Sequence, residues 1–198
     1  MLENLAKSTA RFFVSQNIVK SEYEEIYAYG MEILLSTVIN GIIVLIIAIL
    51  SNTVLPSLLV FTAFILMRRS AGGYHAKTHI GCMMILAAVH LMFIVFFHII
   101  PESVIPILSY IAIAYACVSI YLFAPAEHPN KPLSSDDRRK LRLKSLIYIL
   151  SISVVDLLMI FCAHYDVSLC LSYGIIVSTT GMLAEIISLR PENTNEET

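Results

Sequence analysis

The chain has 198 residues, of which 58% are hydrophobic and 14% are charged. Soluble domains typically contain about 25% charged residues, so this composition excludes an ordinary soluble domain and predicts a membrane protein. The net charge of −2 gives the chain no overall basic character, and we therefore expect no nucleic-acid partner.

The N-terminal stretch, residues 1–29, is charged and lacks an apolar region followed by a small-residue cleavage site, unlike a signal peptide. Within it, Leu2–Val19 places apolar residues loosely along one helical face. This pattern predicts an amphipathic helix at the membrane interface or, alternatively, a cap that packs on the other helices.

Six hydrophobic segments follow, and they predict an all-α, polytopic bundle of about six transmembrane helices. Five of them have the roughly 17–25 residues that a membrane-spanning helix needs. The second has only 14 residues, so we expect it to be short or re-entrant. Residues 1–190 then form a single integral-membrane domain, and residues 191–198 form a short acidic tail. The segments are Ile33–Leu50, Val54–Met67, Gly81–Ile100, Val104–Ala124, Ser145–Tyr165 and Leu169–Leu189.

Two connectors between these segments are basic: Arg68–Ile80 (the loop 68–80) and Pro125–Lys144 (the loop 125–144). The other connectors carry almost no charge. Basic loops stay on the cytoplasmic side of a membrane. Six crossings therefore predict that both basic loops and both termini are cytoplasmic.

The first basic connector and the residues after it, Arg68–Cys82, read R-R-S-A-G-G-Y-H-A-K-T-H-I-G-C. Cysteine is a strong nucleophile when a histidine lies within hydrogen-bond reach. His79, three residues before Cys82, would share its helical face, whereas His75 would lie about 10.5 Å away along an unbroken helix and needs a bend in the chain. A third hypothesis makes His75, His79 and Cys82 the ligands of a metal, although a fourth ligand is lacking. The spacing alone leaves these alternatives open.

Other polar residues are candidates for supporting roles. Glu127, Asp156 or Glu185 could orient the histidine, although packing inside the bundle is the more favoured role for Asp156. The run Arg138, Arg139 and Lys140 is typical of an anchor beside anionic lipids, and it could also attract an acidic substrate. Cysteines inside or at the edge of the apolar segments are expected to be inert packing residues: Cys117, Cys162 and Cys170. Histidines in or beside these segments are expected to be helix-packing or interfacial residues: His90, His98 and His164.

The pattern R-x4-G-x-H-x6-C, formed by Arg68, Gly73, His75 and Cys82, resembles the AgrB family (accessory gene regulator B) of bacterial membrane cysteine endopeptidases. The stretch A-P-A-E-H-P-N-K-P-L at Ala124–Leu133 is similar to a second motif of that family. Length and hydrophobic layout match over nearly the whole chain. The resemblance implies that Cys82 is the nucleophile and His75 its general base, with Arg68 and Gly73 in support.

The resemblance also implies a substrate and a location. The substrate is the short precursor of an autoinducing quorum-sensing peptide, which is cleaved through an acyl-enzyme thioester and closed into a thiolactone or lactone ring. No cofactor or metal is expected. The expected location is the bacterial cytoplasmic membrane, with the lipid bilayer and, plausibly, a second copy of the chain as partners. The alternative functions are a small peptide transporter or channel and the metalloenzyme described above.

Overall fold

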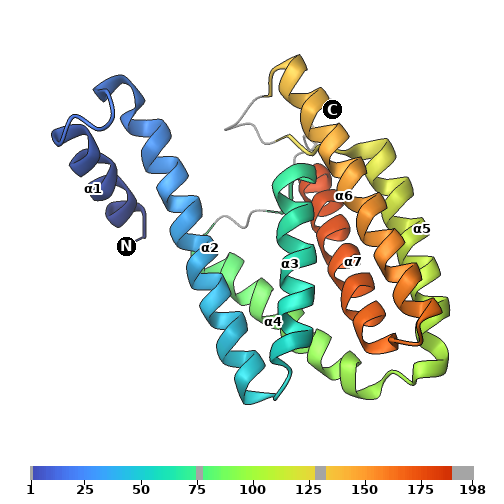
Figure 1. The fold of residues 1–198 in the computed structure, drawn as a ribbon. Coiled ribbons are helices and arrows are strands. Elements are labelled where there is room, and N and C mark those ends of the chain that lie inside the picture. Colours follow the sequence, from blue (N-terminus) through green and yellow to red (C-terminus); the bar gives the residue numbers. More distant parts are fainter. Residues whose placement is uncertain (1, 75–77, 128–132, 189–198) are drawn as a thin grey trace, which may run out of the picture.

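The computed structural model describes residues 2–74, 78–127 and 133–188. In these ranges the chain forms seven α-helices and two short 3-10 turns, arranged as Figure 1 shows. Six helices, α2 to α7, are long and apolar enough to cross a membrane, which confirms the predicted polytopic helical bundle. The bounds are α1 Leu2–Ser15, α2 Glu24–Leu50, α3 Val54–Ala71, α4 His79–Ile99, α5 Ile105–Phe123, α6 Ser135–Phe161 and α7 Tyr165–Ser188, with 3-10 turns at Ser21–Tyr23 and Glu102–Val104.

Helix α7 is the centre of the bundle and packs against α3, α5 and α6, with a smaller contact to α4. Every residue from Ser168 to Ile175 is buried. The approach of α3 is closest at Gly174, where an added Cβ would lie 2.8 Å from the Cβ of Ala63 and 3.0 Å from the carbonyl oxygen of Val60. Small residues at such a crossing allow two helices in a membrane to gain backbone-to-backbone van der Waals contact.

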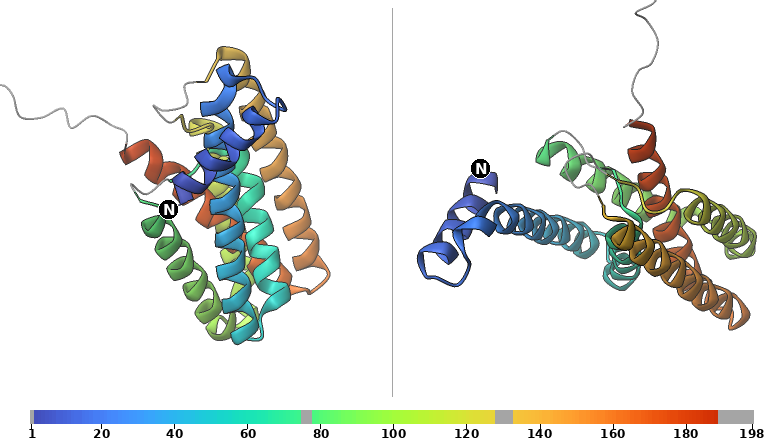
Figure 2. Two further views of the ribbon diagram at one scale, coloured as in Figure 1. Left: turned by 90° about the vertical axis from the view of Figure 1, so that its left-hand side faces the viewer. Right: turned by 90° about the horizontal axis from the view of Figure 1, so that it is seen from above.

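Helix α4 is less tightly packed than the others. It contacts α2 and α7, and its buried side chains are His90 and Phe93. Figures 1 and 2 show that α4 runs obliquely to the neighbouring α3, α5, α6 and α7. A cavity borders this loosely packed helix.

Helix α1 packs along α2, with Ala6 and Ala10 buried and an ion pair of 3.4 Å between Arg11 and Glu24. Leu5 and Phe12 remain exposed. The helix therefore packs on its neighbour, as one of the two sequence hypotheses expected, and its contact with a membrane interface stays a prediction.

Several helices differ in their bounds from the sequence expectation, including α7, which begins at Tyr165 instead of Leu169. Helix α2 begins at Glu24 instead of Ile33, and α3 continues for four residues beyond Met67 to reach 18 residues without a break. Helix α6 begins at Ser135, so the second half of the expected loop 125–144 is helical. The cause is an N-terminal cap: the Ser134 hydroxyl accepts a hydrogen bond from the backbone N–H of Asp137 at 3.1 Å.

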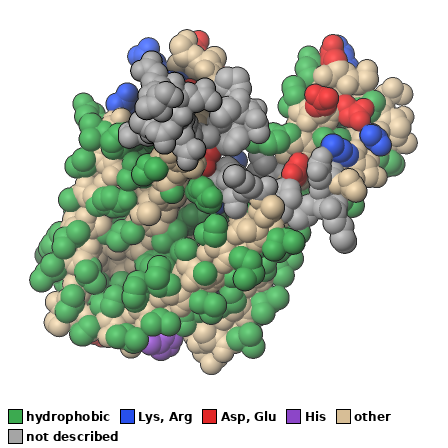
Figure 3. Space-filling view, turned by 180° about the vertical axis from the view of Figure 1, so that it is seen from behind, with side chains coloured by type: hydrophobic (Ala, Val, Ile, Leu, Met, Phe, Trp, Pro, Cys, Tyr) green, Lys and Arg blue, Asp and Glu red, His purple; other side chains and the backbone are tan. Residues whose placement is uncertain are grey.

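The outer surface of the bundle suits a lipid environment. Hydrophobic side chains cover most of the face in Figure 3, and the charged side chains gather toward its upper end. Exposed apolar residues recur along α2, α4, α5 and α6, including Val38, Leu91, Val118 and Leu150. A soluble protein rarely exposes apolar patches of this extent. The chain is a multi-pass membrane protein.

We predict that Gly174→Ala destabilises the bundle, whereas Gly30→Ala does not. The added methyl at position 174 meets Ala63 and backbone of α3, and such overpacking costs about 1–3 kcal/mol. Gly30 has no atom within 4 Å of its Cβ position, and alanine favours a helix over glycine. Thermal unfolding of the purified protein in detergent measures both effects. Equal unfolding temperatures for the two variants would contradict the close α3–α7 crossing.

Candidate active site

Cys82 lies in the first turn of α4, where its backbone N–H donates to the carbonyl of Thr78 at 3.1 Å. Thr78 also caps this helix, because its hydroxyl accepts from the N–H of Gly81 at 3.1 Å. The side chain of Cys82 is half-buried. The N-terminal end of a helix carries a partial positive charge, and Cys82 lies within the first turn next to it.

Arg68 lies beside both Cys82 and Gly73, while the supporting roles that the motif implies for Arg68 and Gly73 stay a prediction. The Nη2 atom of Arg68 is 4.0 Å from the Cys82 Sγ and donates to the carbonyl oxygen of Tyr74 at 3.2 Å. The guanidinium also lies over the ring of Phe64, 5.5 Å from its centroid. A Cβ on Gly73 would approach the Arg68 Cγ to 3.1 Å, so the absence of a side chain here lets Arg68 lie close to the loop. Because α3 extends to Ala71, a helix and not a loop positions this arginine.

The second motif packs directly on the first. The N–H of Ala126 donates to the carbonyl of Ala71 at 2.9 Å, which joins the α5–α6 connection to the end of α3. Gly72 follows with φ +86°, and a Cβ there would lie 2.9 Å from the Ala126 carbonyl oxygen. Only glycine adopts this backbone region readily and leaves room for the approach. Two stretches some fifty positions apart thus form one unit.

The basic residues of α6 differ in their contacts: some bind neighbouring groups of the protein and others are exposed. Arg138 forms a two-point ion pair with Glu127, at 2.8 Å and 2.5 Å, so its charge is already matched. Arg142 donates to the carbonyl of Tyr121 at 2.7 Å. Arg139 and Lys140 are exposed. Of the three predicted substrate-binding cations, two therefore present their charge to the surroundings, and the role of all three stays a prediction.

Asp156 is fully buried between α6 and α7, far from the cysteine. Its two carboxylate oxygens accept hydrogen bonds from Ser168 at 2.5 Å and Ser172 at 2.6 Å. Ser172 precedes Gly181 by nine residues on α7, or about 13 Å of helix. This carboxylate joins two helices, as the packing hypothesis expected, and its position does not suit an orienting role at Cys82.

Glu185 is a candidate carboxylate on the part of α7 that borders the first motif. It is 4% exposed and follows Gly181 by one helical turn on the same face of α7. The Cβ position of Gly181 is 3.8 Å from the backbone nitrogen of Tyr74. Tyr74 immediately precedes His75, so Glu185 belongs to the part of α7 that adjoins the first motif.

A cavity of about 640 Å³ opens beside Cys82 and extends between α4 and α7. Sequence reasoning did not predict it, because it depends on how α4 packs. Arg68, Gly73, Tyr74 and Cys82 line one end, and the lining reaches Ile100, which directly follows α4, at the other end. Ligand pockets typically measure about 300–1,000 Å³. The cysteine therefore adjoins a space large enough for a bound molecule.

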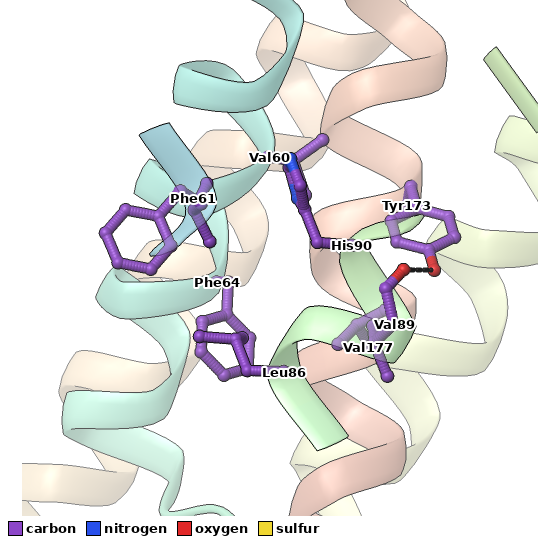
Figure 4. A pocket seen from close by; sticks show the side chains of 9 residues that line it. Val60, Phe61, Phe64, Leu86, Val89, His90, Tyr173 and Val177 are labelled. Carbon is purple, nitrogen blue, oxygen red and sulfur yellow. Dashed lines mark hydrogen bonds between the residues drawn. The ribbon is translucent and has the colours of Figure 1, made fainter. Parts of the chain in front are cut away.

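His90 occupies a separate, small pocket of about 20 Å³, shown in Figure 4 with the surrounding side chains of α3, α4 and α7. Its Nε2 lies 2.9 Å from the hydroxyl of Ser57. The pocket holds at most a water molecule. His90 is thus a packing residue that links α4 to α3, which confirms the sequence interpretation.

The two histidines of the competing hypotheses are not placed by the structure. His75 lies outside the described residues, and of His79 only the backbone, at the start of α4, is described. Asn130–Lys131–Pro132 of the second motif and the acidic tail also lie outside them. Among the described residues, no three His, Cys, Asp or Glu side chains gather as a metal site would require. The metal hypothesis thus rests on residues that the structure does not describe.

The fold and site define a multi-pass membrane protein with a cysteine at the end of a partly open, largely apolar cavity. The family described as accessory gene regulator B, AgrB, matches residues 6–189. The chain belongs to this family, which connects it with the accessory gene regulator quorum-sensing system and with peptide processing.

Proteins with curated descriptions show the same relationship. The chain is 28% identical over 184 residues to an AgrB-like protein of Clostridium perfringens strain SM101, covering 90% of this chain and 86% of the relative. It is 29% identical to a second AgrB-like protein from Clostridium perfringens strain 13, covering 77% and 73%. An AgrB-like protein of Listeria innocua is 27% identical, covering 82% and 74%. No solved structure gives a significant match.

We predict that Gly72→Ala lowers the thermal stability of the protein, because a side chain at φ +86° is strained and meets the Ala126 carbonyl. Strained backbone of this kind costs about 1–3 kcal/mol. Gly41→Ala is the matched control, since its Cβ meets the ring of Phe61 at an ordinary 3.6 Å. Thermal unfolding in detergent compares the two. An unchanged unfolding temperature for Gly72→Ala would show that the two motifs do not depend on this contact.

Proposed function

We propose that the chain is a membrane cysteine endopeptidase that cleaves a short precursor peptide and closes the retained part into a thiolactone or lactone signalling peptide. The observation that carries this proposal is the position of Cys82. Its sulfur lies at a helix N-terminus, 4.0 Å from the Arg68 guanidinium, and at the opening of a large cavity. Helix termini and cations both activate cysteine nucleophiles.

In the first step, the Cys82 thiolate attacks the carbonyl carbon of the scissile bond, and the amide C–N bond then breaks. His75 accepts the thiol proton and donates it to the leaving amine, so the precursor's C-terminal part departs with a free amino group. Arg68 places positive charge where the attacked carbonyl oxygen becomes negative. The product is a thioester between Cys82 and the retained peptide.

In the second step, a side-chain thiol or hydroxyl of the retained peptide attacks the thioester carbonyl. The C–S bond to Cys82 breaks, the attacking group loses its proton to His75, and the cysteine regains it. Transfer to a thiol is nearly isoenergetic, so cyclisation requires that water be kept from the thioester. The apolar lining of the cavity beside Cys82 supports such protection.

Two grounds support His75 as the general base: the family motif and the position of Tyr74, the residue before it in the chain. Tyr74 lines the same cavity as Cys82, and its carbonyl is held by Arg68. His75 follows Tyr74 directly. Glu185, buried one turn from Gly181, is the favoured candidate to orient it.

The site is proposed to lie at the cytoplasmic surface of a bacterial membrane. Both connections that join the motifs, α3–α4 and α5–α6, meet at one end of the bundle, where α2 begins and α7 ends. The exposed cations Arg139 and Lys140 lie at the same end. Positive charge favours the cytoplasmic side, and it would attract an acidic precursor tail.

We predict that Cys82→Ser abolishes cleavage of a co-expressed precursor, whereas Cys162→Ser leaves it unchanged. Cys162 is exposed at the opposite end of α6. Loss of the nucleophile in such enzymes costs about 10⁴-fold or more in rate. The measurement is mass analysis of the fragments released from candidate precursors encoded near the gene. Normal cleavage by Cys82→Ser at wild-type expression would exclude the peptidase mechanism and favour a transporter.

We predict that His75→Ala abolishes cleavage and that His79→Ala retains it, because the family motif assigns the base to the first histidine. A thiol alkylator should inactivate the wild type, and a chelator should not. The same mass analysis, with membrane abundance as the control for folding, tests all four conditions. Loss of activity in His79→Ala together with chelator sensitivity would instead favour the metalloenzyme.

A further inference from the structure

We propose that the cavity beside Cys82 binds apolar side chains of the precursor residues just before the cleaved bond, and so selects the substrate by the size of those side chains. This inference rests on the proposed function, since it requires that Cys82 attack a peptide. It adds the chemical class of the residues on the acyl side of the scissile bond.

The cavity extends to the residue whose sulfur is proposed to react, Cys82. Cys82 lines one end, together with Arg68 and Tyr74, and the lining extends along α4 to Ile100. The distance from Cys82 to Ile100 is 18 residues of helix, or about 27 Å. A peptide joined to Cys82 as a thioester therefore begins at the mouth of this space.

The walls of the cavity offer little to a polar group. Most of the lining is aliphatic or aromatic, contributed by residues such as Leu86, Met92 and Ile176. Apart from Tyr74 at the Cys82 end, the hydroxyl-bearing residues of the lining have partners in the protein. Ser172 donates to Asp156 and Tyr173 to the carbonyl of Val89, Ser178 donates to its own helix, and Thr180 lies 3.2 Å from the hydroxyl of Tyr115.

Because the lining is apolar, it determines which groups of a peptide can be buried in the cavity. A buried peptide N–H or carbonyl without a partner costs several kcal/mol, so the backbone would remain at the Cys82 end, where polar groups are present. Apolar side chains meet no such cost, and burial of one leucine-sized side chain contributes about 1.5–3 kcal/mol. A volume of about 640 Å³ accommodates more than one of them.

The acyl side of the scissile bond fits this space better than the leaving tail does. The tail must depart after the first step, and the exposed cations Arg139 and Lys140 offer an acidic tail a site at the surface. The acyl part must stay on Cys82 until the ring closes, out of contact with water. Apolar side chains seated in the cavity would hold it there.

The test uses the full-length protein in nanodiscs and synthetic precursors that carry Phe, Leu, Ala, Ser or Asp at the two positions before the cleaved bond. We expect kcat/KM for the Phe and Leu peptides to exceed that for the Ser and Asp peptides at least about tenfold. Ala184→Phe, which adds bulk to the cavity wall, should lower kcat/KM for the Phe peptide more than for the Ala peptide. Ala88→Phe, at an exposed position of α4, should match the wild type on every peptide.

Equal kcat/KM for all peptides with the wild type would overturn the inference without any variant, while the proposed function would stand. An equal loss for every peptide in Ala184→Phe would also count against it. Native mass spectrometry that finds a phospholipid bound to the wild type and absent from Ala184→Phe, with cleavage of the panel unchanged, would assign the cavity to a lipid. Failure of the proposed function is a separate result: Cys82→Ser would then cleave as well as the wild type.

Discussion

The candidate site depends on the contact between the end of α3 and the connection that follows α5. Gly72, in a backbone conformation suited to glycine, allows Ala126 to donate to the carbonyl of Ala71. The contact lies at the C-terminal end of α3. Arg68, in the last turn of this helix, extends its guanidinium to the Cys82 sulfur. It also brings Glu127 within reach of Arg138 on α6. One short backbone contact thus sets the relative positions of α3, α6 and the loop that precedes the cysteine.

The bundle combines a tightly packed part with a loosely packed one. Helix α7 is held against α3 at Gly174 and against α6 by the buried Asp156 network. In a close-packed interior, adding or removing even one methylene group changes the stability of the protein. Helix α4 has few buried residues and borders the cavity. The stability of the fold therefore comes mainly from α3, α5, α6 and α7, so that α4 can carry the cysteine without filling the space beside it.

The sequence predicted the class of fold, because six apolar segments were sufficient to predict the helices. The structure places Arg68 beside both Gly73 and Cys82, whereas the roles that the motif implies for these residues stay a prediction. The start of α6 was missed although Ser134 and Asp137 form a recognisable cap. The cavity could not be predicted, because α4 is apolar on all sides and its periodicity does not distinguish a lipid-facing side from an inward-facing one. The placement of Glu185 beside the first motif required tertiary structure for the same reason.

Two polar contacts explain why the space beside α4 persists instead of closing. His90 lies 2.9 Å from Ser57 on α3, and Tyr173 on α7 donates to the carbonyl of Val89 at 2.6 Å. Both contacts lie near the middle of α4, about two turns from Cys82. Hydrogen bonds have a fixed length, so they set the distance of α4 from its neighbours at that level, whereas apolar contacts alone would favour closer packing. Helix α4 is oblique to α7, and the cavity that it borders reaches Cys82 near the N-terminal end of α4.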